Sequence, residues 1–249
     1  RAAFGRIMQT MQPEVYIRKL SAVLPNAPVG NDQMEAVLGM VGGLPSRVRR
    51  TILRSNAITS RHYAVDPQSG RATHSNTELA AADMQCLSCG TSYPDQILPG
   101  HGVMVHGLVA NAPPCEVASL SGVCVAGMAA MKYAYQSIRS GEHRHAVAVA
   151  SECASAVMRG DNFRAEIESR DWENARPEIA FEKDFLRWML SDGAGAAYLC
   201  DAPNPRGISL KIRWIELVSY ANEMPVCMYA GGEVRDGRFV GWKEVDAQE

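Results

Sequence analysis

The chain has 249 residues, a net charge of −2 at pH 7, 47% hydrophobic residues and 21% charged residues. These values are typical of a globular protein with a sizeable core, in one large domain or two small ones. The charge gives no reason to expect nucleic acid as a partner, and no apolar run is as long as a membrane span. Seven scattered cysteines and an N-terminus without a signal-peptide core predict a cytoplasmic protein.

The first predicted elements are a strand and a helix. Residues 1–12 have weak character and are taken as a leader. The apolar, β-branched stretch from Val15 to Leu24 predicts a strand that ends at Pro25-Asn26. Asn31 is placed to cap a helix whose apolar residues recur at spacings of three and four up to Val41.

A basic stretch follows, and its arginines are Arg47, Arg49, Arg50, Arg54 and Arg61. Such a run is usually a solvated surface. The alternative is a docking surface for an anionic group, either the phosphorylated arm of a cofactor or an acidic carrier protein. The residues alone leave both open.

Two cysteines at C-x-x-C spacing invite a metal or redox assignment. Ser75 to Glu78 is a capping box for a short helix at 79–82, and Met84 to Cys89 then predicts a buried strand. On a strand, Cys86 and Cys89 point to opposite faces, and there is no second pair to complete a zinc site. We therefore predict two core cysteines and no metal.

Cys124 lies at a predicted strand-to-helix turn. Cys115 to Ser119 predicts a short buried strand, and Val125 to Ser140 predicts a helix that Gly141 ends. Amide N–H groups and the helix dipole at such a turn favour a thiolate, which is a strong nucleophile. A neighbouring N–H can stabilise the oxyanion formed on a thioester. The alternative is a packed core cysteine.

Two histidines in a short helix or turn at 100–109 are possible bases for Cys124. Nothing in the spacing links His101 or His106 to that cysteine, so we expect neutral histidines satisfied by packing and backbone contacts.

The later elements indicate a layered α/β protein. Ala146 to Ser151 predicts a strand covered on both faces, so that strand, helix and strand form a βαβ unit. The charged excursion at 160–182 suits a lid or an interface. Ser191 to Leu199 predicts a tight turn and a buried strand, since the phosphate-loop pattern is absent. Beyond the linker at 201–205, alternation over 208–214 predicts a half-buried strand.

Three of these segments together resemble the ketosynthase III family, the thiolase-fold condensing enzymes. They are Cys89 to Gln96, the Cys124 turn, and Ser191 to Ala196, and the resemblance runs from about residue 13 to residue 201. The stretch from Phe185 to Gly195 is similar in particular to the branch that makes dialkylresorcinols and related polyketide-like lipids.

The resemblance implies an α/β fold of the thiolase-like, five-layer αβαβα type, made of two similar halves, and a homodimer. Residues 13–202 would be the complete N-terminal half that carries the nucleophile. Residues 203–249 would be the start of a C-terminal half that is truncated.

The resemblance also implies the chemistry. Cys124 would take an acyl group from a thioester of coenzyme A or acyl carrier protein, with its own backbone N–H as half of the oxyanion hole. The acyl-enzyme would condense with a carbanion made by decarboxylating a malonyl or β-ketoacyl thioester, in fatty-acid or polyketide-like lipid synthesis. Leu98 would wall the acyl pocket of the partner subunit, and no cofactor beyond the thioester substrates is implied.

Two departures from the family affect this prediction. The family's histidine and asparagine, which stabilise the carbanion, would lie beyond Glu249, so the chain as given is predicted inactive in condensation. Arg50 stands where many members of the family have a tryptophan that stacks on the adenine of coenzyme A. The arginine therefore favours a carrier protein over coenzyme A as the acyl donor. We assign carrier binding to Arg47, Arg49, Arg50 and Arg54.

Two alternatives to a condensing enzyme stay open. One is a thiolase or thioester hydrolase of the same fold, and the other is a non-catalytic subunit that binds a carrier protein.

Overall fold

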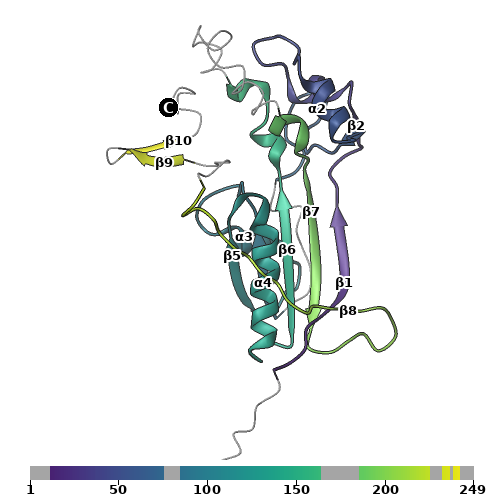
Figure 1. The fold of residues 1–249 in the computed structure, drawn as a ribbon, viewed down its shortest axis with the longest axis vertical. Coiled ribbons are helices and arrows are strands. Elements are labelled where there is room, and N and C mark those ends of the chain that lie inside the picture. The colour runs from purple at the N-terminus through teal and green to yellow at the C-terminus, as the bar shows by residue number, and fades with distance from the viewer. Residues whose placement is uncertain (1–11, 76–84, 164–184, 225–231, 236–237, 242–249) are drawn as a thin grey trace, which may run out of the picture.

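The computed structural model describes residues 12–75, 85–163, 185–224, 232–235 and 238–241. In that part of the chain, a six-stranded sheet in the order β5-β4-β6-β7-β1-β8 forms the body of the molecule (Figure 1). Its strands are β1 (Tyr16–Val23), β4 (Cys86–Gly90), β5 (Glu116–Leu120), β6 (His145–Glu152), β7 (Gly193–Cys200) and β8 (Leu210–Lys211). β4, β5 and β6 run parallel, and β7 runs antiparallel to both β6 and β1.

The described helices and smaller strands lie around this sheet. They are α1 (Met34–Leu38), α2 (Arg49–Ser55), α3 (His101–Leu108), α4 (Ala126–Arg139), β2 (Val29–Gly30), β3 (Ser60–Arg61), β9 (Gly232–Arg235) and β10 (Arg238–Gly241). Residues 185–189 are also helical. β2 pairs with β3, and β9 pairs with β10 in a hairpin outside the main sheet.

One helix covers each face of the sheet, because successive side chains of a strand point to opposite sides. On one face Ala146 and Ala148 of β6 pack with Ala134 and Ile138 of α4. On the other face the intervening β6 valines pack with Val105 of α3. The result is a three-layer α/β/α body.

The two C-x-x-C cysteines confirm this alternation. Cys86 belongs to the core beneath α4, whereas Cys89 belongs to the core beneath α3, and both are fully buried. The prediction of two core cysteines on opposite faces is correct.

The predicted βαβ unit is also present. β5, α4 and β6 follow one another in the chain, and the two strands run parallel with β4 between them. Parallel strands need such a crossover, and α4 supplies it. Both β5 and β6 end at the edge where α4 begins.

A small helical cap sits above the sheet in Figure 1. α1, α2 and the β2-β3 pair enclose the fully buried Trp188. The predicted helix is shorter than expected. α1 starts after Gln33 and ends before Gly39, which has a φ of 79°. Asn31 does not cap the helix, because its side-chain amide donates to Ile58 O over 2.7 Å.

Two predicted strands differ from expectation in burial. β5 is only half-buried, because it is the outermost strand of the sheet on its side. The predicted strand at 208–214 is reduced to Leu210–Lys211, and Trp214 is 76% exposed. β8 pairs with β1, and Ile212 packs partly against the core beneath α4. Ile208, Leu210 and Trp214 remain exposed, so the alternation predicted burial correctly only in part.

Several expectations fall on residues outside the described ranges. They are the leader up to residue 11, the helix at 79–82, most of the excursion at 160–182 and most of the tail after residue 224. Within the described part, no helix is both long and apolar enough to cross a membrane.

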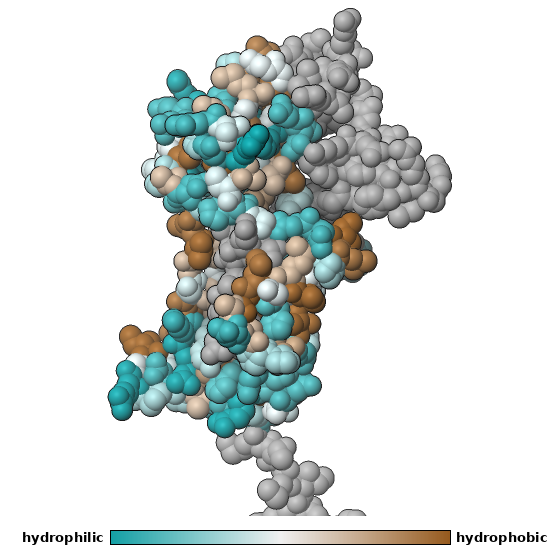
Figure 2. Space-filling model, turned by 180° about the vertical axis from the view of Figure 1, so that it is seen from behind, coloured by the Kyte–Doolittle hydropathy of each residue, from teal (hydrophilic) through white to brown (hydrophobic). Residues whose placement is uncertain are grey.

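Apolar side chains remain exposed on several segments. Examples are Leu20 on β1, Leu98, Met128 on α4 and Ile208. Figure 2 shows hydrophobic residues gathered across the middle of the rear face. Extended exposed patches of this kind are typical of surfaces that contact another protein, a membrane or a ligand.

Candidate active site

Cys124 lies in a short 3-10 turn, Val123–Val125, between β5 and α4. Among the cysteines that the structure describes, only Cys124 is exposed; Cys115 is half-buried, and the buried ones are Cys86, Cys89, Cys153 and Cys200. The packed-core alternative is therefore excluded for this thiol. As the second residue of the turn, Cys124 also has a backbone N–H for which the helix provides no acceptor.

The turn before Cys124 is strained. Gly122 has a φ of 147° and Val123 has a φ of 35°, a region that β-branched residues rarely adopt. Two hydrogen bonds hold it: Val125 N–H donates to Gly122 O over 2.9 Å, and the Ser92 hydroxyl donates to Val123 O over 3.1 Å. Backbone strain of this kind persists only when the surroundings enforce it, and it is concentrated at functional sites.

Two glycines allow the start of α4 to lie directly on the sheet. A Cβ atom added to Gly90 would lie 2.2 Å from Ala126 O, and one added to Gly127 would lie 2.7 Å from the Cβ of Ala150. Neither distance is possible for real side chains, so both positions require glycine. The close contact sets the height of Cys124 above the ends of β4 and β6.

Cys124 opens into a cavity of about 480 Å³. The walls come from the ends of β4 and β6, the start of β7 and the helical residues near 186–190, and they are mainly apolar. The lining includes small residues such as Ala150 and Gly195 and the larger Leu186 and Met158. A mostly apolar cavity with one nucleophile at its edge suits an acyl chain.

Glu152 places a carboxylate in the same cavity. It accepts hydrogen bonds from the Ser92 N–H over 2.8 Å, the Tyr93 N–H over 3.1 Å and the Thr91 hydroxyl over 3.1 Å. Burial, and secondarily this carboxylate, raise the pKa of Tyr93. Glu152 thus fixes the 91–93 segment, whose Ser92 in turn holds the Cys124 turn.

Asp192 anchors the start of β7. Its carboxylate accepts hydrogen bonds from Ala64 N–H over 2.5 Å, from Ser155 N–H over 2.8 Å and from the Ser155 hydroxyl. Burial raises the pKa of Asp192, and these hydrogen bonds oppose that shift. The Ser-Asp-Gly turn therefore joins the cap to the sheet and positions Gly193, which lines the Cys124 cavity.

The two histidines are not in the Cys124 cavity. His101 is buried, and its Nε2 lies 2.9 Å from the Ser151 hydroxyl. Burial lowers the pKa of His101, which favours the neutral ring. The Nε2 atom of His106 lies 3.2 Å from Pro113 O. Neither lines the cavity. The expectation of a satisfied histidine is not met in full at His101, because its Nδ1 atom is buried without a hydrogen-bond partner in the described part of the chain.

Leu98 stands apart from this chain's own cavity. It is 81% exposed and lies just before α3, and it is not among the residues that line the cavity. A role for Leu98 in catalysis would therefore require a second subunit.

The predicted carrier-binding arginines divide into two groups. Arg49 forms an ion pair of 2.8 Å with the buried Glu35 and lies 5.8 Å from the Trp188 ring, so it supports the cap. Arg47, Arg50 and Arg54 are exposed. Arg49, Arg50 and Arg54 also line a second cavity of about 550 Å³ on the cap.

No protein-family model matches the chain. Solved structures with the same fold include the tetronic acid condensing enzyme AbyA1, 20% identical with a TM-score of 0.56 over 75% of this chain and 54% of that one. The ketosynthase III FabH of Pseudomonas aeruginosa is 18% identical, with a TM-score of 0.54 over 78% of this chain and 53% of FabH. OleA of Xanthomonas campestris is 18% identical, with a TM-score of 0.54 over 76% of this chain and 56% of OleA.

The fold is thus a mixed α/β fold of the thiolase-like class, matching about half of each solved chain. Within that class the chain is distantly related to the ketosynthase III condensing enzymes. The β-ketoacyl-[acyl-carrier-protein] synthase III of Sphingopyxis alaskensis is 27% identical over 132 residues, 52% of this chain and 34% of the relative. The synthase III of Thiobacillus denitrificans is 24% identical over 197 residues, which are 71% of this chain and 55% of that relative. The chain therefore spans between one third and just over half of these relatives.

Proposed function

We propose that Cys124 is the acyl-accepting nucleophile of a condensing enzyme related to ketosynthase III. The observation that carries the proposal is the exposed thiol at the start of α4, on a strained turn, at the edge of the mainly apolar cavity. In the first step the sulfur attacks the thioester carbonyl carbon, the carbon–sulfur bond of the donor breaks, and the donor leaves as a thiol with the proton. The amide N–H groups at the start of the helix support the oxyanion.

The whole protein would then carry out a decarboxylative Claisen condensation. The acyl-Cys124 intermediate reacts with the carbanion formed when a malonyl or β-ketoacyl thioester loses CO2. The product would be a fatty-acid precursor or a polyketide-like lipid, as in the dialkylresorcinol-type branch. The family resemblance assigns stabilisation of the carbanion to a histidine and an asparagine of the second half.

The proposed acyl donor is a carrier protein, and the proposed assembly is a homodimer. Arg47, Arg50 and Arg54 are exposed cations on the cap, where an acidic carrier can dock. Arg49 would contribute through its support of the cap, given its ion pair with Glu35. The exposure of Leu98 supports its assignment to the acyl pocket of a partner subunit.

Acylation of Cys124 can be measured by intact-mass spectrometry after incubation with a medium-chain acyl thioester. We expect the chain to gain the mass of one acyl group and Cys124→Ala to gain none. Cys115→Ala is the matched control, because Cys115 is the half-buried cysteine nearest in sequence, and it should be acylated normally. Acylation of the Cys124→Ala variant would contradict the proposal.

The same experiment separates the alternatives. Continuous release of free acid, with no accumulated acyl-enzyme, would indicate a thioester hydrolase. Absence of any mass gain in the full-length protein would indicate a non-catalytic, carrier-binding subunit. Release of CO2 from a malonyl thioester by the full-length protein would support condensation.

A further inference from the structure

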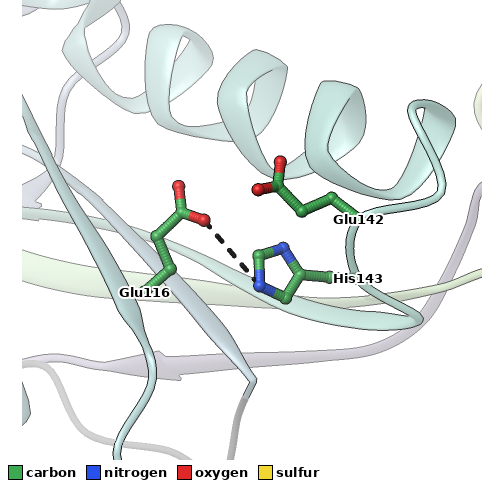
Figure 3. A group of neighbouring side chains, drawn as sticks. All are labelled: Glu116, Glu142 and His143. Atoms are coloured by element: carbon green, nitrogen blue, oxygen red, sulfur yellow. Dashed lines mark ion pairs between the residues drawn. The ribbon is translucent and has the colours of Figure 1, made fainter.

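Three side chains of metal-binding type meet at the end of the molecule away from Cys124. Glu116 is the first residue of β5, and Glu142 and His143 follow the last turn of α4. One potential ligand atom from each lies within 4.8 Å of those from the other two. Figure 3 shows the three side chains converging from the strand and from the loop after the helix.

The imidazole of His143 makes no side-chain hydrogen bond within the described part of the chain. Its Nδ1 atom is buried without a partner, and its Nε2 atom lies 3.8 Å from Glu116 Oε2, which is too long for a hydrogen bond. The side chain is only 17% exposed. A metal ion binds only one nitrogen of an imidazole ring. An ion on Nδ1 would satisfy this buried atom, and Nε2 would then face Glu116.

The three groups are close enough to share one ion after small side-chain movements. With bonds of about 2.0 to 2.2 Å, the ligand atoms of a tetrahedral zinc ion lie about 3.4 Å apart. The potential ligand atoms lie within 4.8 Å of one another, so the side chains have to close around the ion. Glu142 is exposed, so its carboxylate is free to rotate inward.

The surroundings orient the ligands and favour a cation. Tyr133 donates its hydroxyl proton to Glu116 Oε1, which leaves Oε2 directed at His143. Ligating carboxylates are commonly held by such a donor. The negative end of the α4 dipole points at the same place.

We propose that Glu116, Glu142 and His143 bind one divalent transition-metal ion, with Zn²⁺ as the best match to two carboxylates and one imidazole. α4 has 14 residues and is about 21 Å long, so the site is remote from Cys124 at the other end of the helix. The ion has a structural role: it joins the first residue of β5 to the loop after α4, the two ends of the segment that carries the nucleophile.

The test is calorimetric titration of the chelator-treated chain with Zn²⁺, with the melting temperature measured in parallel. We expect one ion per chain, a higher melting temperature with Zn²⁺, and affinity about tenfold lower or worse in Glu142→Gln and His143→Gln. Glu142 is exposed, so its variant should fold. His106→Gln is the matched control, and it should bind as the unmodified chain does.

Co²⁺ absorption identifies the ligand type. Ligation by carboxylates and imidazole gives only weak visible bands, and a strong sulfur-to-cobalt band would place the ion on cysteines and overturn the proposal. So would the absence of Zn²⁺ binding at micromolar concentration, or equal affinity in all three variants. In those cases Glu116 and His143 form no more than an ion pair.

Discussion

At the scale of single residues, Glu152 connects the sheet to the nucleophile without being close to Cys124 in sequence. Its two oxygens accept three hydrogen bonds from consecutive residues of the 91–93 segment. Ser92 of that segment holds the strained carbonyl of Val123. The strain at Val123 is therefore maintained through Glu152, which acts as a positioning residue for the thiol.

Replacing Glu152 by glutamine should slow acylation of Cys124 about tenfold or more. The amide can accept on one atom only, and its NH2 group would face the backbone N–H donors, so at least one buried donor loses its partner at a cost of about 1 to 3 kcal/mol. The measurement is the rate of mass gain with an acyl thioester. Glu152→Asp should recover part of the rate. Glu223→Gln is the exposed control, and a normal rate in Glu152→Gln would contradict this role.

At the scale of elements, the contact between α4 and the sheet depends on Gly127. Its position above Ala150 leaves no room for a methyl group. The first turn of α4 carries the amides proposed to stabilise the oxyanion, so a shift of this turn changes the geometry of the reaction. The stability of the fold and the rate of acylation should respond together.

Gly127→Ala should therefore destabilise the protein by about 1 to 3 kcal/mol and slow acylation of Cys124. Gly107→Ala is a matched control, because it is also a glycine within a helix but has no heavy atom near the added methyl. That substitution should stabilise the protein by up to about 1 kcal/mol. Chemical unfolding and the acylation rate measure both effects. Equal behaviour of the two variants would show that the contact at Ala150 is unimportant.

The sequence was sufficient for elements whose signals are local. The alternating small residues of β6 and the helix ended by Gly141 predicted β6 and α4 closely. The turn at Cys124 followed from the same signals. The early end of α1 at Gly39 and the exposure of 208–214 could not be predicted, since they depend on what packs against each segment. Tertiary contacts overrode the local pattern there.

The partners of the nucleophile were less accessible to sequence reasoning. Glu152 is 60 residues from Ser92, and Asp192 is 128 residues from Ala64. Their roles arise from hydrogen bonds between segments that only the sheet order brings together. The Ser-Asp-Gly motif was visible in the sequence, but the function of its aspartate as an anchor for the cap was not.

At the scale of the whole molecule, the near-neutral net charge hides a local asymmetry. The chain carries −2 overall, yet three arginines within eight residues of the cap are exposed, and two of them, Arg50 and Arg54, line the 550 Å³ cavity. Charges of one sign on a surface accelerate encounter with a partner of opposite sign, and salt screens this effect. If the donor is an acidic carrier protein, acyl transfer should depend on these arginines, whereas transfer from a small neutral thioester should not.

The substitution of Arg47, Arg50 and Arg54 together by glutamate tests this. Acylation of Cys124 from an acyl carrier protein should fall about tenfold or more at low salt, and rising salt should narrow the difference from the unmodified chain. Acylation from a small neutral thioester should be unchanged, because the site itself is untouched. Replacing the exposed Arg71, Arg206 and Arg213 by glutamate is the control for net charge, because it changes the charge by the same amount. An equal loss with both donors would mean that the substitutions disturb the cap, and the carrier surface would then have to be sought elsewhere on the molecule.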